Sequence, residues 1–267
     1  MLVDTHCHLN LQHYQDDLDI VVQRAMESGI GGILVPGTDL QTSQKAIDIS
    51  DLYPMVYAAV GIHPNEARSW NSETIHILRE LAQHPKVVAI GEIGLDYYRD
   101  YSTPKEQDAI LQEQLALASE VNKPVILHGR NAFNALIASV EIWLKQLQEF
   151  HSPLENRPGV FHSFEGDEIQ VLRAIESSFL IGVAGPVTFK NARQTQQIVR
   201  TLPIKSIILE TDAPYLAPHP HRGTRNEPGY LTSIASKVAE LRNTDLVNIE
   251  ASTTANANLL FSWSMTV

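Results

Sequence analysis

Eight short apolar runs recur along the chain, and they constrain its fold more than any other feature. Each run is almost continuously apolar, which is typical of parallel strands that are buried on both faces. The expected strands cover residues 2–4, 32–36, 55–61, 87–93, 124–128, 159–162, 179–183 and 207–210. Longer segments with helical periodicity separate these runs, and strands that alternate with helices indicate an α/β fold with a parallel sheet.

Local signals mark the ends of several expected helices. These helices include residues 16–29, 72–84, 103–122 and 224–243. Gly29 is expected to cap the first of them at its carboxyl end. Ser72, followed by Glu73, is expected to begin the second. Thr103 is expected to be the N-cap of the third, with Pro104 at its first helical position.

The number of strand–helix units favours a closed barrel in a single domain over residues 1–267. Eight parallel strands with intervening helices form a TIM-type (β/α)8 barrel, which typically needs about 250 residues. No linker, low-complexity tract or block of charge marks a domain boundary. The alternative is a doubly wound open sheet, which needs a glycine-rich phosphate turn after an early strand. Residues 35–39 (VPGTD) are a weak candidate for that turn, and no GxGxxG motif follows.

Charge and cysteine content exclude several classes of protein. The net charge of −11 argues against a protein that coats nucleic acid non-specifically, because such binding relies on basic residues. It does not exclude an enzyme that acts on phosphate, since a metal can supply local positive charge. The single cysteine, Cys7, cannot form an internal disulfide, which favours a reducing compartment. With no leader and no apolar stretch near the roughly 20 residues of a membrane span, we expect a soluble, cytoplasmic protein without a stable protein partner.

Two histidines at the end of the first expected strand introduce the candidate site. His6 and His8 are two residues apart, so in a strand they point to one side while Cys7 points to the other. At the carboxyl end of a barrel strand, both imidazoles would face the barrel mouth, where active sites of this architecture lie. Cys7 is expected to pack behind the strand as a small hydrophobe.

Further residues of the ligand type stand where other apolar runs end. They are Glu92, His128, His162 and Asp212. Imidazole and carboxylate groups suit divalent transition metals, and four histidines with two carboxylates could hold two ions about 3.5–4 Å apart. Each residue also has an ordinary interpretation. A lone histidine can be a hydrogen-bonding loop residue, Glu92 could cap a helix or pair with an arginine, and Asp212 could serve a turn. Their shared position at one barrel end favours the metal site.

Several motifs together resemble a known family. VDTHCHL, GIHP, IGEIGLDYY, FHSFEG, ILETDAPYL and RGTRNEP occur in this order from Val3 to about Phe261. The set resembles the signatures of the TatD family of metal-dependent hydrolases, within the amidohydrolase-like barrel superfamily. This resemblance implies a TIM-type barrel with a centre of two divalent ions, which could be Mg, Mn, Zn, Fe or Ni.

The resemblance also implies a set of ligands. One ion would be held by His6, His8, Glu92 and Asp212. The second would be held by Glu92, His128 and His162, with Glu92 as the bridge. The bridge is a glutamate here, where other members of the superfamily use a lysine.

Other residues are candidates for catalysis and substrate binding. Asp212 is the expected general base, because it can both touch a metal and accept a proton from bound water; it could also be a ligand only. The resemblance suggests that His63 faces a substrate phosphate, and the alternative is a loop histidine bonded to backbone. Arg130 could meet an anionic substrate or pair with a nearby acid. Tyr97 and Tyr98 could stack on a base, although packing at the rim is the simpler interpretation.

The segment 216–228 (LAPHPHRGTRNEP) forms a local basic cluster in an acidic chain. Loops after the last barrel strands often hold phosphate, and arginine suits bidentate phosphate contact, so Arg222 is a candidate for substrate binding. The alternative is that this segment pins the barrel closed, with Asn226 and Glu227 bonding to backbone. Lys190 is expected to be solvated.

Three functions are considered for these residues, two hydrolases that share the site and one from another class. The first is a deoxyribonuclease that cleaves DNA phosphodiesters with metal-activated water, with a 3′–5′ exonuclease as the form considered. The second keeps the site but cleaves a carboxyl ester or amide, as a D-aminoacyl-tRNA deacylase does. The third is a non-enzymatic barrel that binds a partner or stores metal. The third predicts a closed site, and clustering of the ligands at a barrel mouth speaks against it.

Overall fold

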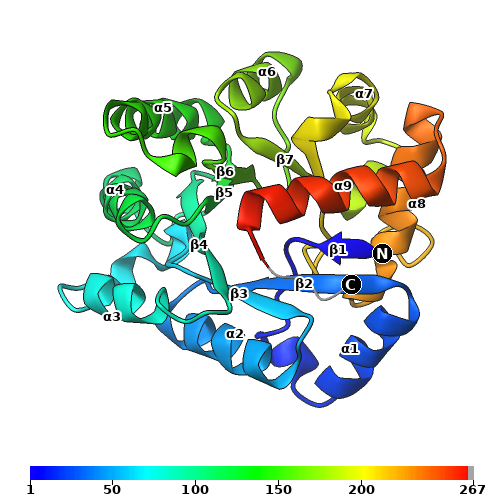
Figure 1. Ribbon diagram of the computed structural model, residues 1–267, viewed down its shortest axis with the longest axis horizontal. Helices are drawn as coiled ribbons and strands as arrows, with labels where there is room; N and C mark the ends of the chain where they lie inside the picture. The colour runs from blue at the N-terminus through cyan, green and yellow to red at the C-terminus, as the bar shows by residue number, and fades with distance from the viewer. Residues whose placement is uncertain (264–267) are drawn as a thin grey trace.

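The computed structural model describes residues 1–263, and its central feature is one parallel sheet with the strand order β1 to β8 (Figure 1). The strands are β1 (Leu2–Asp4), β2 (Ile30–Pro36), β3 (Val56–Val60), β4 (Val87–Asp96), β5 (Val125–Arg130), β6 (Gly159–Phe161), β7 (Leu180–Val183) and β8 (Ile207–Leu209). Thr5 N donates to Leu209 O at 3.1 Å, and Cys7 forms a parallel bridge with Ala213. These contacts bring the segments after β8 and β1 together, so the predicted TIM-type barrel is confirmed.

Helices surround the sheet. They are α1 (Leu18–Glu27), α2 (Leu40–Leu52), α3 (Thr74–Leu81), α4 (Pro104–Val121), α5 (Phe133–Glu149), α6 (Glu168–Glu176), α7 (Arg193–Thr201), α8 (Leu231–Arg242) and α9 (Leu246–Phe261). Short 3-10 turns include η2 (Pro64–Ser69), η4 (Gly185–Thr188), η5 (Ile204–Ser206) and η6 (Pro228–Tyr230). Within residues 1–263, no helix combines the length and apolar character needed to cross a membrane.

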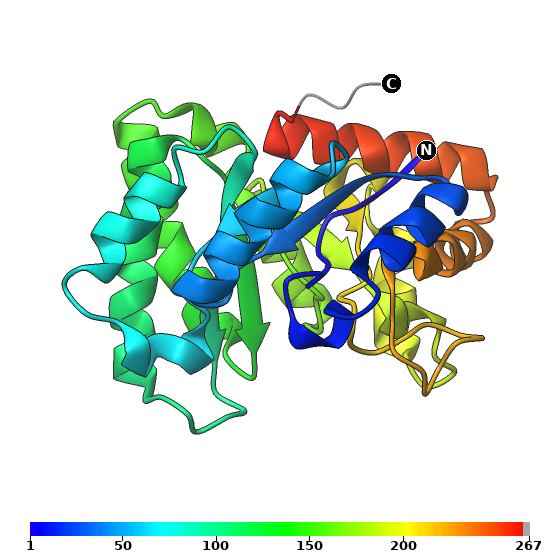
Figure 2. The same ribbon diagram turned by 90° about the horizontal axis from the view of Figure 1, so that it is seen from below.

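The strands carry apolar side chains on both faces, which accounts for their continuous apolar runs. Ile33 and Val35 belong to the large core between the sheet and the surrounding helices. Leu34, between them, belongs to a second core inside the barrel, together with Phe261 and Trp263 near the end of α9. In Figure 1, α9 lies across one end of the barrel close to the chain termini. Figure 2 shows this closed end at the top and the loops that follow the strands at the bottom. The candidate site is therefore at the open end.

The helix ends agree only partly with the local signals. Thr103 is the N-cap of α4 with Pro104 in the first turn, and Thr103 and Glu106 form a reciprocal capping box. Gly29 directly follows the C-cap Ser28 and has a φ of +82°, which suits glycine. The prediction for Ser72 was wrong, since α3 begins at Thr74 after Glu73 and neither side chain caps it.

Two boundaries differ from prediction in ways that affect the site. β4 continues to Asp96, three residues past its expected end at 93, so Glu92 lies inside the strand and not at its end. Residues 224–227 precede η6 and α8 as loop, although a helix was expected from 224. Pro228 lacks an amide hydrogen and suits the first position of a helical turn, which explains a later start. The prediction that residues 1–267 form one domain stays a prediction, because 264–267 lie outside the described part of the chain.

Candidate metal centre

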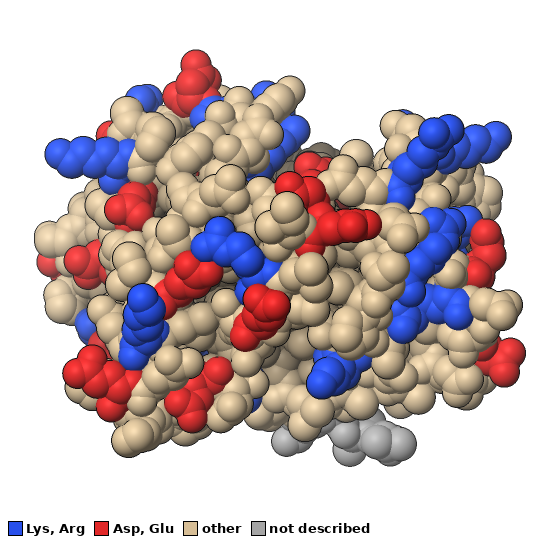
Figure 3. Space-filling view, turned by 90° about the horizontal axis from the view of Figure 1, so that it is seen from above, with Lys and Arg blue, Asp and Glu red and all other residues tan. Residues whose placement is uncertain are grey.

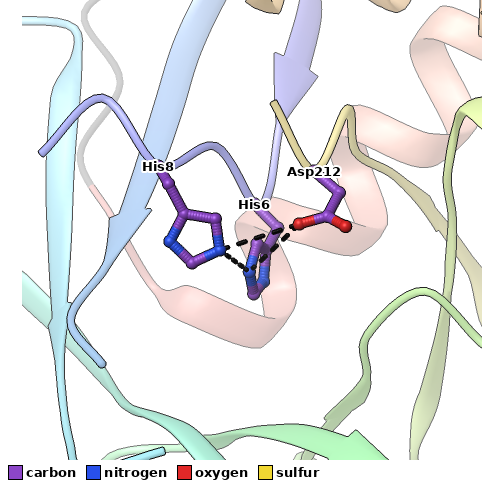
Figure 4. A group of neighbouring side chains, drawn as sticks. All are labelled: His6, His8 and Asp212. Atoms are coloured by element: carbon purple, nitrogen blue, oxygen red, sulfur yellow. Dashed lines mark hydrogen bonds and ion pairs between the residues drawn. The ribbon is translucent and has the colours of Figure 1, made fainter. Parts of the chain in front are cut away.

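The first part of the site lies where the chain leaves β1 and β8. Backbone bonds continue beyond both strands: Asp212 N donates to His6 O at 2.9 Å, and His8 N donates to Ala213 O at 2.7 Å. These bonds hold His6, His8 and Asp212 together with their side chains pointing toward one another (Figure 4). Nε2 of His8 lies 3.6 Å from Asp212 Oδ1, and Nε2 of His6 lies 4.0 Å from the same oxygen.

The histidine pair fits a cation. Nε2 of His6 and Nε2 of His8 are only 3.1 Å apart, and both side chains are buried. Burial lowers the pKa of His8 to about 4 and the pKa of His6 well below its usual value, so both rings are neutral at neutral pH. With the proton of each ring on Nδ1, the lone pairs of both Nε2 atoms would point to the same space. A divalent ion among these nitrogens and the neighbouring carboxylates would satisfy them together.

Glu92 occupies the middle of the site and faces two groups of histidines with its two oxygens. Its Oε2 lies 3.3 Å from Nε2 of His6 and 3.5 Å from Nε2 of His8. Its Oε1 lies 2.8 Å from Nδ1 of His128 and 3.6 Å from Nε2 of His63. Because each carboxylate oxygen meets a different group, Glu92 has the arrangement that a bridging ligand requires.

His162 lies close to His6 and Asp212 and also to Glu92. Its ring stacks on that of His6 with 3.5 Å between centroids, and its Nε2 lies 3.7 Å from Asp212 Oδ1 and 3.9 Å from Glu92 Oε1. The structure thus brings together all the residues predicted as metal ligands: His6, His8, Glu92, His128, His162 and Asp212. Three groups could hold an ion, namely His6 with His8 and Asp212, His6 with Glu92 and His162, and His63 with Glu92 and His128. The inclusion of His63 differs from the predicted ligand sets, which assigned it to substrate.

Two buried carboxylates behind the histidines were missed by the sequence reasoning. Oε1 of Glu210 lies 2.9 Å from Nδ1 of His162, on the ring edge opposite to Nε2. Oδ2 of Asp96 lies 3.3 Å from Nε2 of His128. Carboxylates that face the second nitrogen of a histidine fix the orientation of the ring and increase its basicity. Glu210 and Asp96 are therefore positioning residues for His162 and His128.

Spacing along the strands carries a signal for both carboxylates. Asp96 is four residues after Glu92 in the same strand, and Glu210 is two residues before Asp212. Even spacing places side chains on the same face of an extended segment. A search for carboxylates at even spacing from a candidate ligand would have found both.

Burial and neighbouring charges shift the pKa values of His128 and His162 in opposite directions. Burial alone lowers the pKa of a histidine, but the facing carboxylates outweigh it. Asp96 and Glu92 raise the pKa of His128 to about 9, and Glu210 and Asp212 raise the pKa of His162 to about 10. Both rings therefore bind a proton at neutral pH when no metal is present, at positions that a metal ion would occupy.

The two central carboxylates, Glu92 and Asp212, differ in their pKa values. Burial acts to raise the pKa of Glu92, but the surrounding histidines, His6 and His63 foremost, lower it well below its usual value. Burial dominates at Asp212 and raises its pKa to about 7. Glu92 is thus a fixed negative charge, whereas Asp212 can gain or lose a proton near neutral pH.

The site opens into a cavity of about 570 Å³ at the barrel mouth. His63 and Arg130, both predicted to bind substrate, line this cavity. His63 Nδ1 accepts a hydrogen bond from Asn65 N at 3.1 Å, while the guanidinium of Arg130 lies 3.9 Å from the centre of the Tyr98 ring. Arg222 is not among the residues that line the cavity; its guanidinium packs over Phe189 at 4.2 Å.

The contacts of the segment 216–228 agree with the interpretation that it pins the barrel closed. Arg225 forms an ion pair with Asp17 at 2.6 Å, and Glu227 forms one with Arg24 at 2.5 Å. Asn226 is fully buried and donates to Thr211 O at 2.8 Å and Tyr215 O at 2.7 Å. This segment therefore ties the loop that carries Asp212 to the body of the barrel. The expected bond of Glu227 to backbone is replaced by its pair with Arg24.

A parallel barrel with buried histidines and carboxylates around a shared glutamate at its mouth defines a metal-dependent hydrolase of the amidohydrolase-like type, an enzyme that acts on ester bonds. Residues 3–262 match the protein-family model described as TatD related DNase. The chain belongs to this family.

Individual relatives resemble the chain over almost its whole length. An uncharacterized metal-dependent hydrolase, YabD of Bacillus subtilis, is 38% identical over 98% of this chain and 99% of its own. The 3′-5′ ssDNA/RNA exonuclease TatD of Klebsiella pneumoniae is 36% identical over 97% of both chains. The crystal structure of the TatD homologue YJJV from Escherichia coli superposes with a TM-score of 0.88 at 32% identity and covers 98% of each chain.

Proposed function

We propose that the protein is a 3′–5′ exonuclease that hydrolyses phosphodiester bonds of single-stranded nucleic acid, with DNA as the main substrate. The observation that carries this proposal is the two-sided position of Glu92, since its oxygens face separate groups of histidines. This arrangement suits a pair of ions, and such pairs clamp the oxygens of a phosphoryl group. Relatives in Klebsiella pneumoniae and Escherichia fergusonii are named as 3′-5′ ssDNA/RNA exonucleases, which supports the choice of substrate.

We assign the ligands as the resemblance implied. His6, His8, Glu92 and Asp212 would hold one ion. Glu92, His128 and His162 would hold the other. Mg, Mn, Zn, Fe and Ni all suit a site of nitrogen and oxygen donors. When bound, the ions would lower the pKa of a water molecule and stabilise negative charge on the phosphate. Glu92 keeps the two groups together, and Glu210 and Asp96 hold the outer histidines in orientation.

Asp212 is the proposed general base. It lies at the cavity, and its Oδ1 faces the Nε2 atoms of His8 and His162. A carboxylate at this position can accept a proton from a bound water molecule and later release it. Asp212 is less enclosed than Glu92, with 15% of its side chain exposed against 4%, so water can reach it.

The substrate residues are assigned by their distance from the cavity. His63 and Arg130 line it, so we propose that they contact the phosphate that is cleaved or its neighbour. Arg222 lies outside the lining, and we propose that it contacts a more distant phosphate. Cys7 is free and buried, which suits the reducing environment of the cytoplasm, where we place the enzyme.

The test is hydrolysis of single-stranded DNA that carries a label at its 5′ end, by protein reconstituted with each candidate metal. A 3′–5′ exonuclease shortens the labelled strand one nucleotide at a time. A strand with phosphorothioate linkages at its 3′ end is the matched control and should resist degradation. If protein shown to hold its metals cleaves neither strand but releases an amino acid from D-aminoacyl-tRNA, the nuclease proposal is wrong and the ester alternative replaces it.

A further inference from the structure

Positive charge is concentrated in one part of this acidic chain. No Asp or Glu occurs between Glu176 and Glu210, although the whole chain has a net charge of −11. Four cationic side chains lie in this interval, and all are exposed: Lys190, Arg193, Arg200 and Lys205. We call this set the α7 basic face, because its members lie in α7 or in the segments on either side of it.

The charges of the α7 basic face are not neutralised within the protein, and no acidic residue lies among them in the sequence. Several arginines elsewhere pair with acids, as Arg79 does with Glu120 at 2.6 Å and Arg173 with Glu141 at 2.8 Å. Over the described residues 1–263, no member of the α7 basic face has an ion pair or a side-chain hydrogen bond. Unpaired, exposed cations create a positive potential that is available to an anionic ligand.

The geometry of α7 arranges these charges in a line. Arg193 and Arg200 are seven residues apart, so they lie on the same side of the helix, about 10 Å apart along its axis. Ile198 and Val199 are buried against the core, so the side of the helix that carries Arg193 and Arg200 faces solvent. In Figure 3, blue Lys and Arg side chains gather over the right half of the face, where α7 lies, and extend from the upper edge downward.

The line begins beside the barrel mouth. In a barrel of this type each helix starts at the end where the preceding strand stops, so Arg193 lies at the mouth end of α7 and Arg200 farther away. His219 N donates to Thr188 Oγ1 at 2.9 Å, and Leu216, three residues earlier, lines the cavity. Arg222 then covers Phe189, which is adjacent to Lys190. Cationic side chains therefore continue from the loop at the cavity onto α7.

The neighbouring side of the mouth has the opposite charge. Glu165 lines the cavity, and Asp167 and Glu168 follow it at the start of α6. A polyanion that leaves the cavity is repelled on the α6 side and attracted on the α7 side. The charge distribution therefore favours a path for the polyanion that runs from the cavity over α7.

We propose that the α7 basic face binds the phosphates of single-stranded nucleic acid on the 5′ side of the nucleotide that is being removed. This inference rests on the proposed exonuclease function and adds to it a second binding surface outside the cavity. Exposed Gln197 lies between Arg193 and Arg200 and offers hydrogen bonds to phosphate or sugar, whereas Gln194 donates to Gly166 O at 3.0 Å. Such contacts position a strand without reading its sequence. The surface therefore favours long strands over short ones, with no preference among bases.

The experiment compares the binding of a 30-nucleotide and a 4-nucleotide strand by fluorescence anisotropy, at several salt concentrations. The full chain is used in the presence of Mn²⁺, and phosphorothioate linkages protect both strands from cleavage. The test variant is K190Q/R193Q. The matched control is K105Q/K145Q, which removes two exposed lysines from α4 and α5 that also lack ion pairs.

For single strands, each lost phosphate contact reduces the slope of log affinity against log salt concentration by about 0.7. At 0.1 M salt this corresponds to a loss of about fivefold in affinity. We expect K190Q/R193Q to bind the 30-nucleotide strand about 25-fold more weakly, with the 4-nucleotide strand and the K105Q/K145Q control unaffected. Equal affinity of all three proteins for the long strand overturns the inference, as does an equal loss for both strands. If the unchanged protein still degrades unprotected DNA in that case, the proposed function stands and only the α7 basic face is rejected.

Discussion

Oε1 of Glu210 lies 2.9 Å from Nδ1 of His162, so the ring presents its other nitrogen, Nε2, to Glu92 and Asp212. Glu210 is only 1% exposed and lies outside the set of ligands. Its carboxylate faces the edge of the imidazole that points away from the site. The arrangement explains why a carboxylate two residues before Asp212 is buried at this position.

The first prediction concerns the substitution Glu210→Gln. The amide keeps the shape of the side chain but removes its charge. His162 is then held less firmly in its orientation and is less basic. We expect metal affinity to fall about 10- to 100-fold, as is typical when a partner of a metal-bound histidine is changed. Competition with a chromogenic chelator measures this, and Glu113→Gln on the exposed side of α4 is the control. Unchanged affinity in E210Q would show that Glu210 does not position His162.

The second prediction concerns Asp212→Asn. An amide cannot accept the proton of water, so we expect kcat for hydrolysis of single-stranded DNA to fall about 100- to 10,000-fold. The measurement is made at saturating metal, with bound metal quantified by mass spectrometry. A loss of activity that is fully restored by more metal would identify Asp212 as a ligand only. A loss that persists with both ions bound would agree with its role as general base.

The sequence predicted which side chains meet at the barrel mouth, because strand ends can be recognised locally. His6, His8, His128 and His162 each come at or just after a buried apolar run, and parallel strands deliver such residues to one end of a barrel. Asp212 follows the last run in the same way. These positions depend on topology alone, which a repeated pattern of strands and helices specifies.

Other features depend on packing across the chain and have no local signature. Asp96 was missed because β4 was expected to end at 93, and the strand continues through Gly94, whose φ of +142° is one that other residues rarely adopt. Arg225 looked like part of a basic cluster, yet it pairs with Asp17 near the other end of the sequence. Such pairing is decided by how the loops fold over the barrel, which residue order does not show.

The third prediction concerns the pH dependence of metal binding. In the metal-free protein the pKa of His128 is raised to about 9 and that of His162 to about 10, so both carry a proton at neutral pH. A metal needs the nitrogen lone pair, so binding releases these protons and the apparent affinity rises as the pH increases toward 9. We expect release of about two protons per protein at pH 7.5. Calorimetry in buffers of different ionisation enthalpy measures the number, and an enthalpy that is the same in every buffer would contradict it.

The last prediction concerns Asn226→Ala. Asn226 is fully buried, donates to the carbonyls of Thr211 and Tyr215, and accepts from Glu227 N at 2.9 Å. Alanine leaves these backbone groups without partners in a buried region, and each unsatisfied group costs about 1–3 kcal/mol. With three such groups, we expect the free energy of unfolding to fall by at least about 3 kcal/mol, as measured by urea denaturation.

The same change should reach the metal centre. Thr211 and Tyr215 flank Asp212, so loosening this loop lets the Asp212 carboxylate move away from His6 and His8, and metal affinity falls together with stability. Asn248→Ala provides the control, because Asn248 is exposed on α9 and its side chain has a single partner within residues 1–263, the Thr244 hydroxyl. Its effect on stability should stay within about 0.5 kcal/mol, with no effect on metal binding. If N226A is as stable as the unchanged protein, the segment 216–228 does not secure the barrel mouth, and its polar residues need another explanation.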